Sequence, residues 1–79
     1  MSMENANLDI TVSRTRRTTT YENGPLEIVL ATVYRRYSQW RACCYFGPGD
    51  DDYDEETRST RGAAEQVALR HTLDMTDAL

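Results

Sequence analysis

The residues whose type and spacing are most suggestive of chemistry are six carboxylates within positions 50–56. They are Asp50, Asp51, Asp52, Asp54, Glu55 and Glu56. Three of them have the spacing of calcium-loop ligands, but Glu55 stands where such a loop needs glycine and Arg61 where it needs glutamate. The run also lacks the apolar surroundings that prepare a carboxyl group for acid–base catalysis. Two interpretations stay open: a solvated loop, or a phosphate mimic that fits a groove lined by Arg and Lys.

The other reactive side chains do not combine into a site. His71 is the only histidine and falls on the apolar stripe of a predicted helix, so we expect it to be packed and hydrogen-bonded. Cys43 and Cys44 are neighbours, which would strain a disulfide, and two thiols with one histidine do not complete a zinc site. No serine lies in a nucleophile elbow and no glycines form a phosphate loop. We therefore expect neither an enzyme nor a cofactor or bound metal.

Charge is distributed unevenly along the chain. All nine basic residues are arginines, and the formal net charge is −4. Residues 1–48 carry six arginines against four acids, for +2, whereas residues 49–79 carry three arginines against nine acids, for −6. This balance argues against a general nucleic-acid binder and permits a basic partner, which we expect to be a protein with a nucleic-acid-binding surface.

A second feature is a group of arginines near one end of the predicted sheet, with Tyr34 and Tyr37 beside them. The group comprises Arg14, Arg16, Arg17, Arg35 and Arg36. Basic residues interleaved with aromatic ones can bind single-stranded nucleic acid. The alternative is a charged sheet edge that prevents aggregation.

The element that must position these residues is the stretch 26–46. It holds the only Trp, the only Phe and three of the five Tyr, and Gly-Pro sequences flank it on both sides. Alternation from residue 39 to 46 and many β-branched and aromatic residues predict a β-hairpin. An amphipathic helix is the alternative, because Leu26, Leu30, Val33, Tyr37 and Trp40 recur at helical spacing.

A further strand is expected from residue 8 to about 21, joined to the hairpin by a two-residue turn at Asn23 and Gly24. That turn pairs Tyr21 with Leu26. A second turn at residues 36–37 pairs Val33 with Trp40. One face of the sheet then collects the core residues Ile10, Val12, Val29, Ala31, Val33, Trp40, Ala42 and Cys44. A one-residue change in register would bury Leu26, Ile28 and Leu30 instead.

One helix is predicted from Arg61 to about residue 74, with Ser59 or Thr60 as its N-cap. Its apolar stripe comprises Ala63, Ala64, Val67, Ala68, His71 and Met75. The expected fold is therefore α+β: a three-stranded antiparallel sheet (β-β-β-α) with one C-terminal helix packed on one face. We expect one domain over residues 1–79, with frayed tails at 1–7 and 76–79 and an acidic loop at 47–57.

The second face of the predicted sheet is too apolar for a solvent-exposed surface that contacts nothing else. Its apolar members include Leu26, Ile28, Leu30 and Tyr45. Either a folded-back tail covers this face, or it is a protein interface, with a homodimer or with a partner. No apolar run of 18 residues and no signal-peptide pattern is present, so we expect a cytoplasmic protein without membrane contact.

Two resemblances follow from these features. Three strands followed by a helix is similar to a double-stranded-RNA-binding domain without its first helix, although that family presents Lys where this chain is acidic. The small size, the acidity, the single sheet and helix, and the 50–56 cluster together resemble phage anti-CRISPR proteins. That resemblance implies a non-enzymatic inhibitor that blocks a nucleic-acid-binding surface of a CRISPR effector complex. The six carboxylates would be its contact charges.

Overall fold

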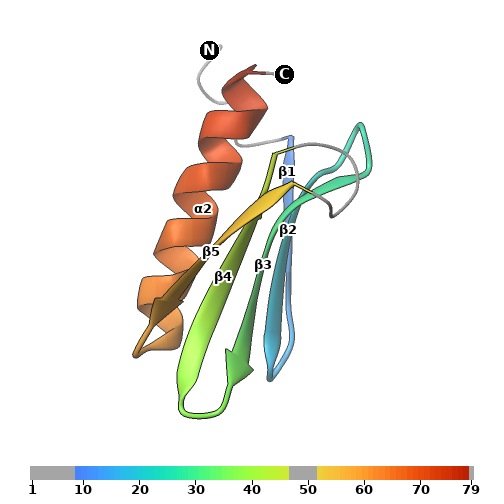
Figure 1. The fold of residues 1–79 in the computed structure, drawn as a ribbon. Helices are drawn as coiled ribbons and strands as arrows, with labels where there is room; N and C mark the ends of the chain where they lie inside the picture. Colours follow the sequence, from blue (N-terminus) through green and yellow to red (C-terminus); the bar gives the residue numbers. More distant parts are fainter. Residues whose placement is uncertain (1–8, 47–51, 79) are drawn as a thin grey trace.

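The computed structural model describes residues 9–46 and 52–78, which form one sheet and one helix. The strands are β1 (Ile10–Arg14), β2 (Thr18–Asn23), β3 (Ile28–Arg36), β4 (Gln39–Tyr45) and β5 (Tyr53–Arg58), and the helix is α2 (Arg61–Ala78). All strand pairs are antiparallel and follow the chain order, and α2 packs across one face of the sheet (Figure 1). The α+β class with one C-terminal helix is confirmed, but the sheet has five strands and not three.

The first additional strand arises because residues 10–21 fold back on themselves. Arg14 pairs with Thr19, and the turn between them has Arg16 and Arg17 at its tip. The Thr15 hydroxyl accepts from the Thr18 amide at 3.1 Å, and the Thr15 amide donates to the Thr18 carbonyl at 2.7 Å. This threonine turn replaces the Gly or Asn chemistry that normally marks a hairpin, so the sequence prediction of one continuous strand was wrong.

The second additional strand lies within the predicted acidic loop. Residues 53–58 pair with β4, with Glu55 opposite Cys43 and Tyr53 opposite Tyr45. Asp and Glu are depleted in strands, and this is why the segment read as a loop. Here the ladder to β4 and an ion pair between Glu55 and Arg41 outweigh that preference. The loop prediction for 47–57 is therefore wrong over residues 53–57, and residues 47–51 lie outside the described part.

The hairpin interpretation of residues 26–46 is confirmed, since β3 and β4 are its two strands. The turn falls on Tyr37 and Ser38, one residue later than predicted, so Val33 pairs with Ala42 and not with Trp40. The shift moves each partner by two residues. Because side chains alternate with a period of two, the predicted core face is preserved for Ala31, Val33, Ala42 and Cys44. All four are buried.

Val29 and Val12 were also predicted to lie in the core, but both are exposed. A bulge in β3 places Leu30 between the pairs Tyr21–Ala31 and Glu22–Val29. Because of the bulge, Val29 points to the opposite face from the one predicted and is 37% exposed. Leu30 is buried, with an exposed fraction of 1%. Val12 is 50% exposed because β1 is an edge strand that α2 hardly covers.

The connection between β2 and β3 is a four-residue loop and not the predicted two-residue turn. Asn23 pairs with Ile28, and the Asn23 side chain accepts from the Leu26 amide at 3.0 Å. Glu27 has a positive φ of 54°. A Cβ at Gly24 would lie 2.9 Å from the Thr11 hydroxyl, so a larger residue there would require the Thr11 side chain to shift.

The helix begins as predicted, because the Thr60 hydroxyl accepts from the Ala63 amide at 3.2 Å and caps it. It ends at Ala78, so residues 76–78 are helical and not the predicted frayed tail. Its fully covered stripe is Ala64, Ala68, Thr72 and Thr76. The two alanines pack against Tyr21, Val33 and Ala42, and their small side chains allow a close approach to the sheet. Thr72 satisfies its buried hydroxyl by donating to the Ala68 carbonyl. In the described part of the chain, no helix is long and apolar enough to cross a membrane.

Candidate functional site

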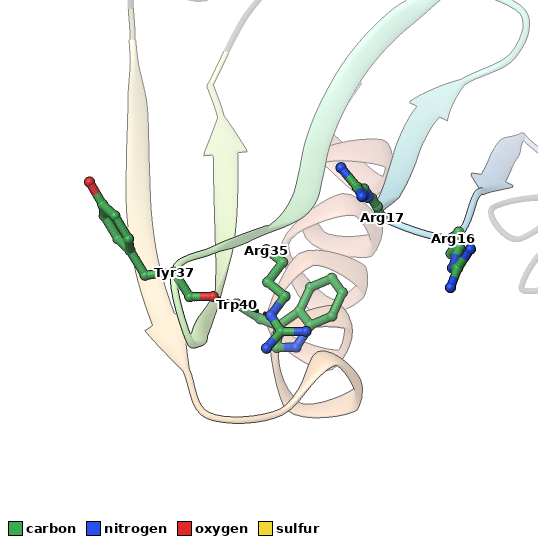
Figure 2. Close-up of a pocket in the computed structure, with 5 residues that line it drawn as sticks. All are labelled: Arg16, Arg17, Arg35, Tyr37 and Trp40. Atoms are coloured by element: carbon green, nitrogen blue, oxygen red, sulfur yellow. Dashed lines mark hydrogen bonds between the residues drawn. The ribbon is translucent and has the colours of Figure 1, made fainter.

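A pocket of about 450 Å³ lies at the end of the sheet that carries the β1–β2 and β3–β4 turns (Figures 1 and 2). Its lining residues are Arg16, Arg17, Arg35, Tyr37 and Trp40. Arg16 and Arg17 form the tip of the β1–β2 turn, while Arg35 and Trp40 lie opposite each other in the β3–β4 ladder. The topology therefore brings three guanidinium groups to one aromatic side chain.

Trp40 forms the floor of this pocket. It is half-buried and packs against the core, and the guanidinium of Arg61 lies 5.1 Å from its ring centroid. That separation is typical of a cation–π contact, so one face of the indole is already occupied by a protein cation. Trp40 therefore supports the site more than it offers an open surface to a ligand.

Arg61 also fixes the turn that carries Arg16 and Arg17. Its Nη1 donates to the Arg16 carbonyl at 2.9 Å, and its Nη2 donates to the carbonyls of Thr15 and Thr18 and to the Thr19 hydroxyl. The side chain is only 15% exposed. The first residue of α2 thus holds the backbone of a turn 45 positions earlier in the chain.

Glu65, one helical turn further on, completes this support. Its carboxylate accepts from Arg14 Nε at 2.7 Å and from the Thr19 hydroxyl at 2.6 Å, and it lies 3.4 Å from Arg61 Nε. The hydrogen bond from Arg14 lowers the pKa of Glu65 below its ordinary value despite the opposing effect of burial, and the Thr19 hydroxyl adds to the lowering. Arg14 and Arg61 therefore share one carboxylate within the fold, which offsets one of their two positive charges.

Arg58 at this end pairs with Glu56, but four other arginines have no such partner in the described part of the chain. Among residues 9–46 and 52–78, no carboxylate lies within ion-pair distance of Arg16, Arg17, Arg35 or Arg36. All four are exposed. The helix also begins at this end, so its N-terminal partial positive charge adds to theirs (Figure 1). The site is an exposed group of cations, suited chemically to an anion with several oxygens.

Tyr37 differs from the other lining residues. Its ring points away from the arginines of the pocket, and its backbone carbonyl accepts from Arg35 Nε at 3.2 Å (Figure 2). The residue is 86% exposed and has a positive φ of 59°. The guanidinium of Arg36 lies 5.8 Å from its ring centroid.

The described carboxylates of the predicted acidic cluster do not form one uniform surface. Asp50 and Asp51 lie outside the described residues, and Asp52 and Asp54 are exposed at the β5 edge. The two glutamates of the run are engaged by other residues.

Glu55 belongs to the open face of the sheet, where its carboxylate accepts from Arg41 at 2.7 Å and from the Tyr34 hydroxyl at 3.1 Å. Burial alone would raise the pKa of Glu55, but the bonds from Cys43, Tyr34 and Arg41 hold it below its ordinary value. Glu56 pairs with Arg58 at 2.8 Å. Half of the described carboxylates in the run are therefore already neutralised.

The four predicted apolar contact residues do not form one surface either. Leu26 is 53% exposed in the β2–β3 loop, whereas Leu30 is a core residue with 1% exposure. Ile28 is half-buried opposite Asn23 in the ladder. Tyr45 is half-buried on the open face, with its hydroxyl 3.4 Å from that of Thr32. Leu30 was therefore wrongly placed on an interaction face.

His71 is packed and hydrogen-bonded, as the sequence predicted. Its Nε2 lies 2.6 Å from the Tyr45 carbonyl, and its ring meets Phe46 edge-on with centroids 5.0 Å apart. It borders a smaller hollow of about 320 Å³ between β5 and α2, where both signs of charge alternate. Within the described ranges, no three His, Cys, Asp or Glu side chains gather closely enough to hold a metal ion.

Sequence reasoning found part of the arginine site. It placed Arg16, Arg17 and Arg35 together, but it also included Arg14, which pairs with Glu65, and Tyr34, which bonds to Glu55. It missed Trp40 as the floor and the supporting roles of Arg61 and Glu65. The only signal for these two was their i, i+4 spacing at the start of the helix.

The fold and the site define a class: a small α+β protein with a five-stranded antiparallel meander, a helix on one face and an arginine pocket at one end of the sheet. Comparisons with models of known protein families, with curated proteins and with solved structures found no match.

Proposed function

We propose that this protein is a small non-enzymatic binding protein that holds the phosphate backbone of a nucleic acid at the arginine pocket. The observation that carries the proposal is the group Arg16, Arg17 and Arg35, three exposed guanidinium groups around one pocket without a carboxylate partner among the described residues. A guanidinium donates two parallel hydrogen bonds to a phosphate, which a lysine ammonium does not do.

The net charge of −4 does not oppose this function, because the charges are separated in space. Seven of the nine arginines lie at or next to the element ends on the pocket side of the sheet. They are Arg14, Arg16, Arg17, Arg35, Arg36, Arg58 and Arg61. The local field at a binding site, and not the total charge, guides an anionic ligand towards it.

The test is a binding titration with a fluorescent oligonucleotide at several salt concentrations. Replacing Arg16, Arg17 and Arg35 together by Gln should weaken binding at least about tenfold, and each lost phosphate contact should reduce the salt slope by about 0.7–0.9. Arg70→Gln is the matched control, since Arg70 is exposed on α2 outside the pocket. Equal affinities of the wild type and the triple variant would refute the proposal.

A second candidate function rests on the acidic edge of β5. Asp54 on this edge strand and Asp52 just before it are exposed and form no ion pair with another described residue. Carboxylates that repeat along an extended edge could meet a basic groove, as the anti-CRISPR resemblance implies for a CRISPR effector complex. Replacing Asp50, Asp51, Asp52 and Asp54 by Asn should then abolish capture of the purified effector complex. Unchanged capture would exclude this function.

A further inference from the structure

The conformation of Tyr37 is not explained by stability. It sits at the tip of a two-residue hairpin turn with φ at 59°, a region that Gly or Asn enters at much lower cost. Tyr37 is 86% exposed, more than any other large hydrophobic residue of the described part. A strained backbone that displays an aromatic ring to solvent is a reason to look for a ligand.

The turn fixes the backbone of Tyr37 beside the pocket. Arg36 pairs with Gln39 to close the turn, and Arg35 Nε binds the Tyr37 carbonyl. The carbonyl therefore faces the pocket while the ring projects away from it (Figure 2). The Arg36 guanidinium lies over one face of the ring, at 5.8 Å from the centroid. The other face of the ring is the one that a ligand could stack on.

On the basis of the proposed function, we infer that the ligand is a single-stranded nucleic acid and that one of its bases stacks on Tyr37. The phosphates next to that base occupy the pocket formed by Arg16, Arg17 and Arg35. Stacking on an aromatic side chain needs a free base face, which a single strand offers and a duplex does not. Arg36 strengthens the stack from the opposite side of the ring.

The experiment compares three probes on the full chain: a thymidine oligomer of about ten nucleotides, a duplex of equal length and inorganic polyphosphate. Tyr37→Asn should weaken binding of the thymidine oligomer about fivefold or more, because loss of one stacked base removes a substantial part of the affinity. Binding of the duplex and of polyphosphate should stay unchanged. Tyr37→Phe keeps the stacking ring and should stay within about twofold of the wild type.

The same variants separate stacking from folding. Asn tolerates a positive φ, so Tyr37→Asn should have an unchanged or higher Tm, and a weaker affinity would then not reflect unfolding. If Tyr37→Asn binds the single strand as tightly as the wild type while the triple arginine variant loses all three probes, the stacking inference is overturned and the proposed function stands. If the wild type binds none of the three probes at low salt, the proposed function fails, and this inference fails with it.

Discussion

Individual arginines in this protein have opposite roles that the sequence does not distinguish. Arg61 is 15% exposed, donates to three backbone carbonyls and contacts Trp40, so it is a structural residue. Arg16 and Arg17 are exposed on the turn that Arg61 holds. The conformational entropy of ordering the turn is therefore lost on folding and not on binding. The backbone that carries the two exposed side chains is already in place before a ligand binds.

The two cysteines provide a prediction at the same scale. Cys43 and Cys44 are 6% and 4% exposed, and burial, with the nearby Glu56 adding to it, raises the pKa of Cys44 to about 11. Burial also raises the pKa of Cys43. Since the thiolate is the reactive form, both thiols should react with a disulfide reagent at pH 8 far more slowly in the folded protein than in urea. Rapid labelling of either thiol under native conditions would contradict this placement.

At the scale of elements, the hairpin and the helix could be predicted because their signals are local. Alternating β-formers mark β4, and a capping threonine followed by alanines marks α2. The split into β1 and β2 could not be predicted, since Arg16 and Arg17 are poor turn residues and their turn depends on Arg61, which is distant in the chain.

The same argument applies to β5 and to the pocket. Residues 53–58 have low strand propensity, and their pairing with β4 depends on contacts such as Glu55 with Arg41 that exist only in the folded protein. The strand boundaries predicted from the sequence placed several arginines at one end of the sheet. The register decided which of them line the pocket, and a turn one residue later than predicted placed Trp40 opposite Arg35.

The junction between α2 and the sheet gives a prediction for Glu65. Glu65→Gln leaves Arg14 and Arg61 without their carboxylate, so the free energy of unfolding at pH 7 should fall by about 1–3 kcal/mol in urea titrations. Glu27→Gln is the control, because Glu27 is exposed and forms no ion pair with another described residue; its effect should stay below about 0.5 kcal/mol.

The pH dependence of the same pair follows from the lowered pKa of Glu65. A carboxyl whose folded pKa is depressed stabilises the protein above its unfolded pKa of 4.5, and that stabilisation is lost as the pH falls through the folded value. The wild type and Glu65→Gln should therefore differ most at neutral pH and converge in acid. A constant difference from pH 7 to pH 3 would mean that the ionised carboxylate is not what holds the junction.

At the scale of the whole molecule, the fold separates the two signs of charge along its length. Arginines lie on the turns and at the helix start at one end of the molecule, and α2 finishes at the other end (Figure 1). Asp9 and Asp52 directly precede β1 and β5, and Asp74 and Asp77 belong to the last part of α2. Both halves of the sequence contribute to each end: Arg58 and Arg61 come from the acidic half, and Asp9 comes from the basic half. The longest axis measures 40 Å.

This separation predicts how the acidic end should affect the arginine end. Replacing Asp50, Asp51, Asp52 and Asp54 by Asn changes the net charge from −4 to 0 and leaves Glu55 and Glu56 in their ion pairs. If nucleic acid binds at the arginine pocket, its affinity should rise in about 10 mM salt, where the Debye length of about 30 Å is comparable to the size of the molecule. The gain should vanish near 150 mM salt, where that length is about 8 Å. An affinity that falls in the fourfold variant at low salt, with an unchanged Tm, would contradict binding of nucleic acid at the arginine pocket under repulsion from the acidic end.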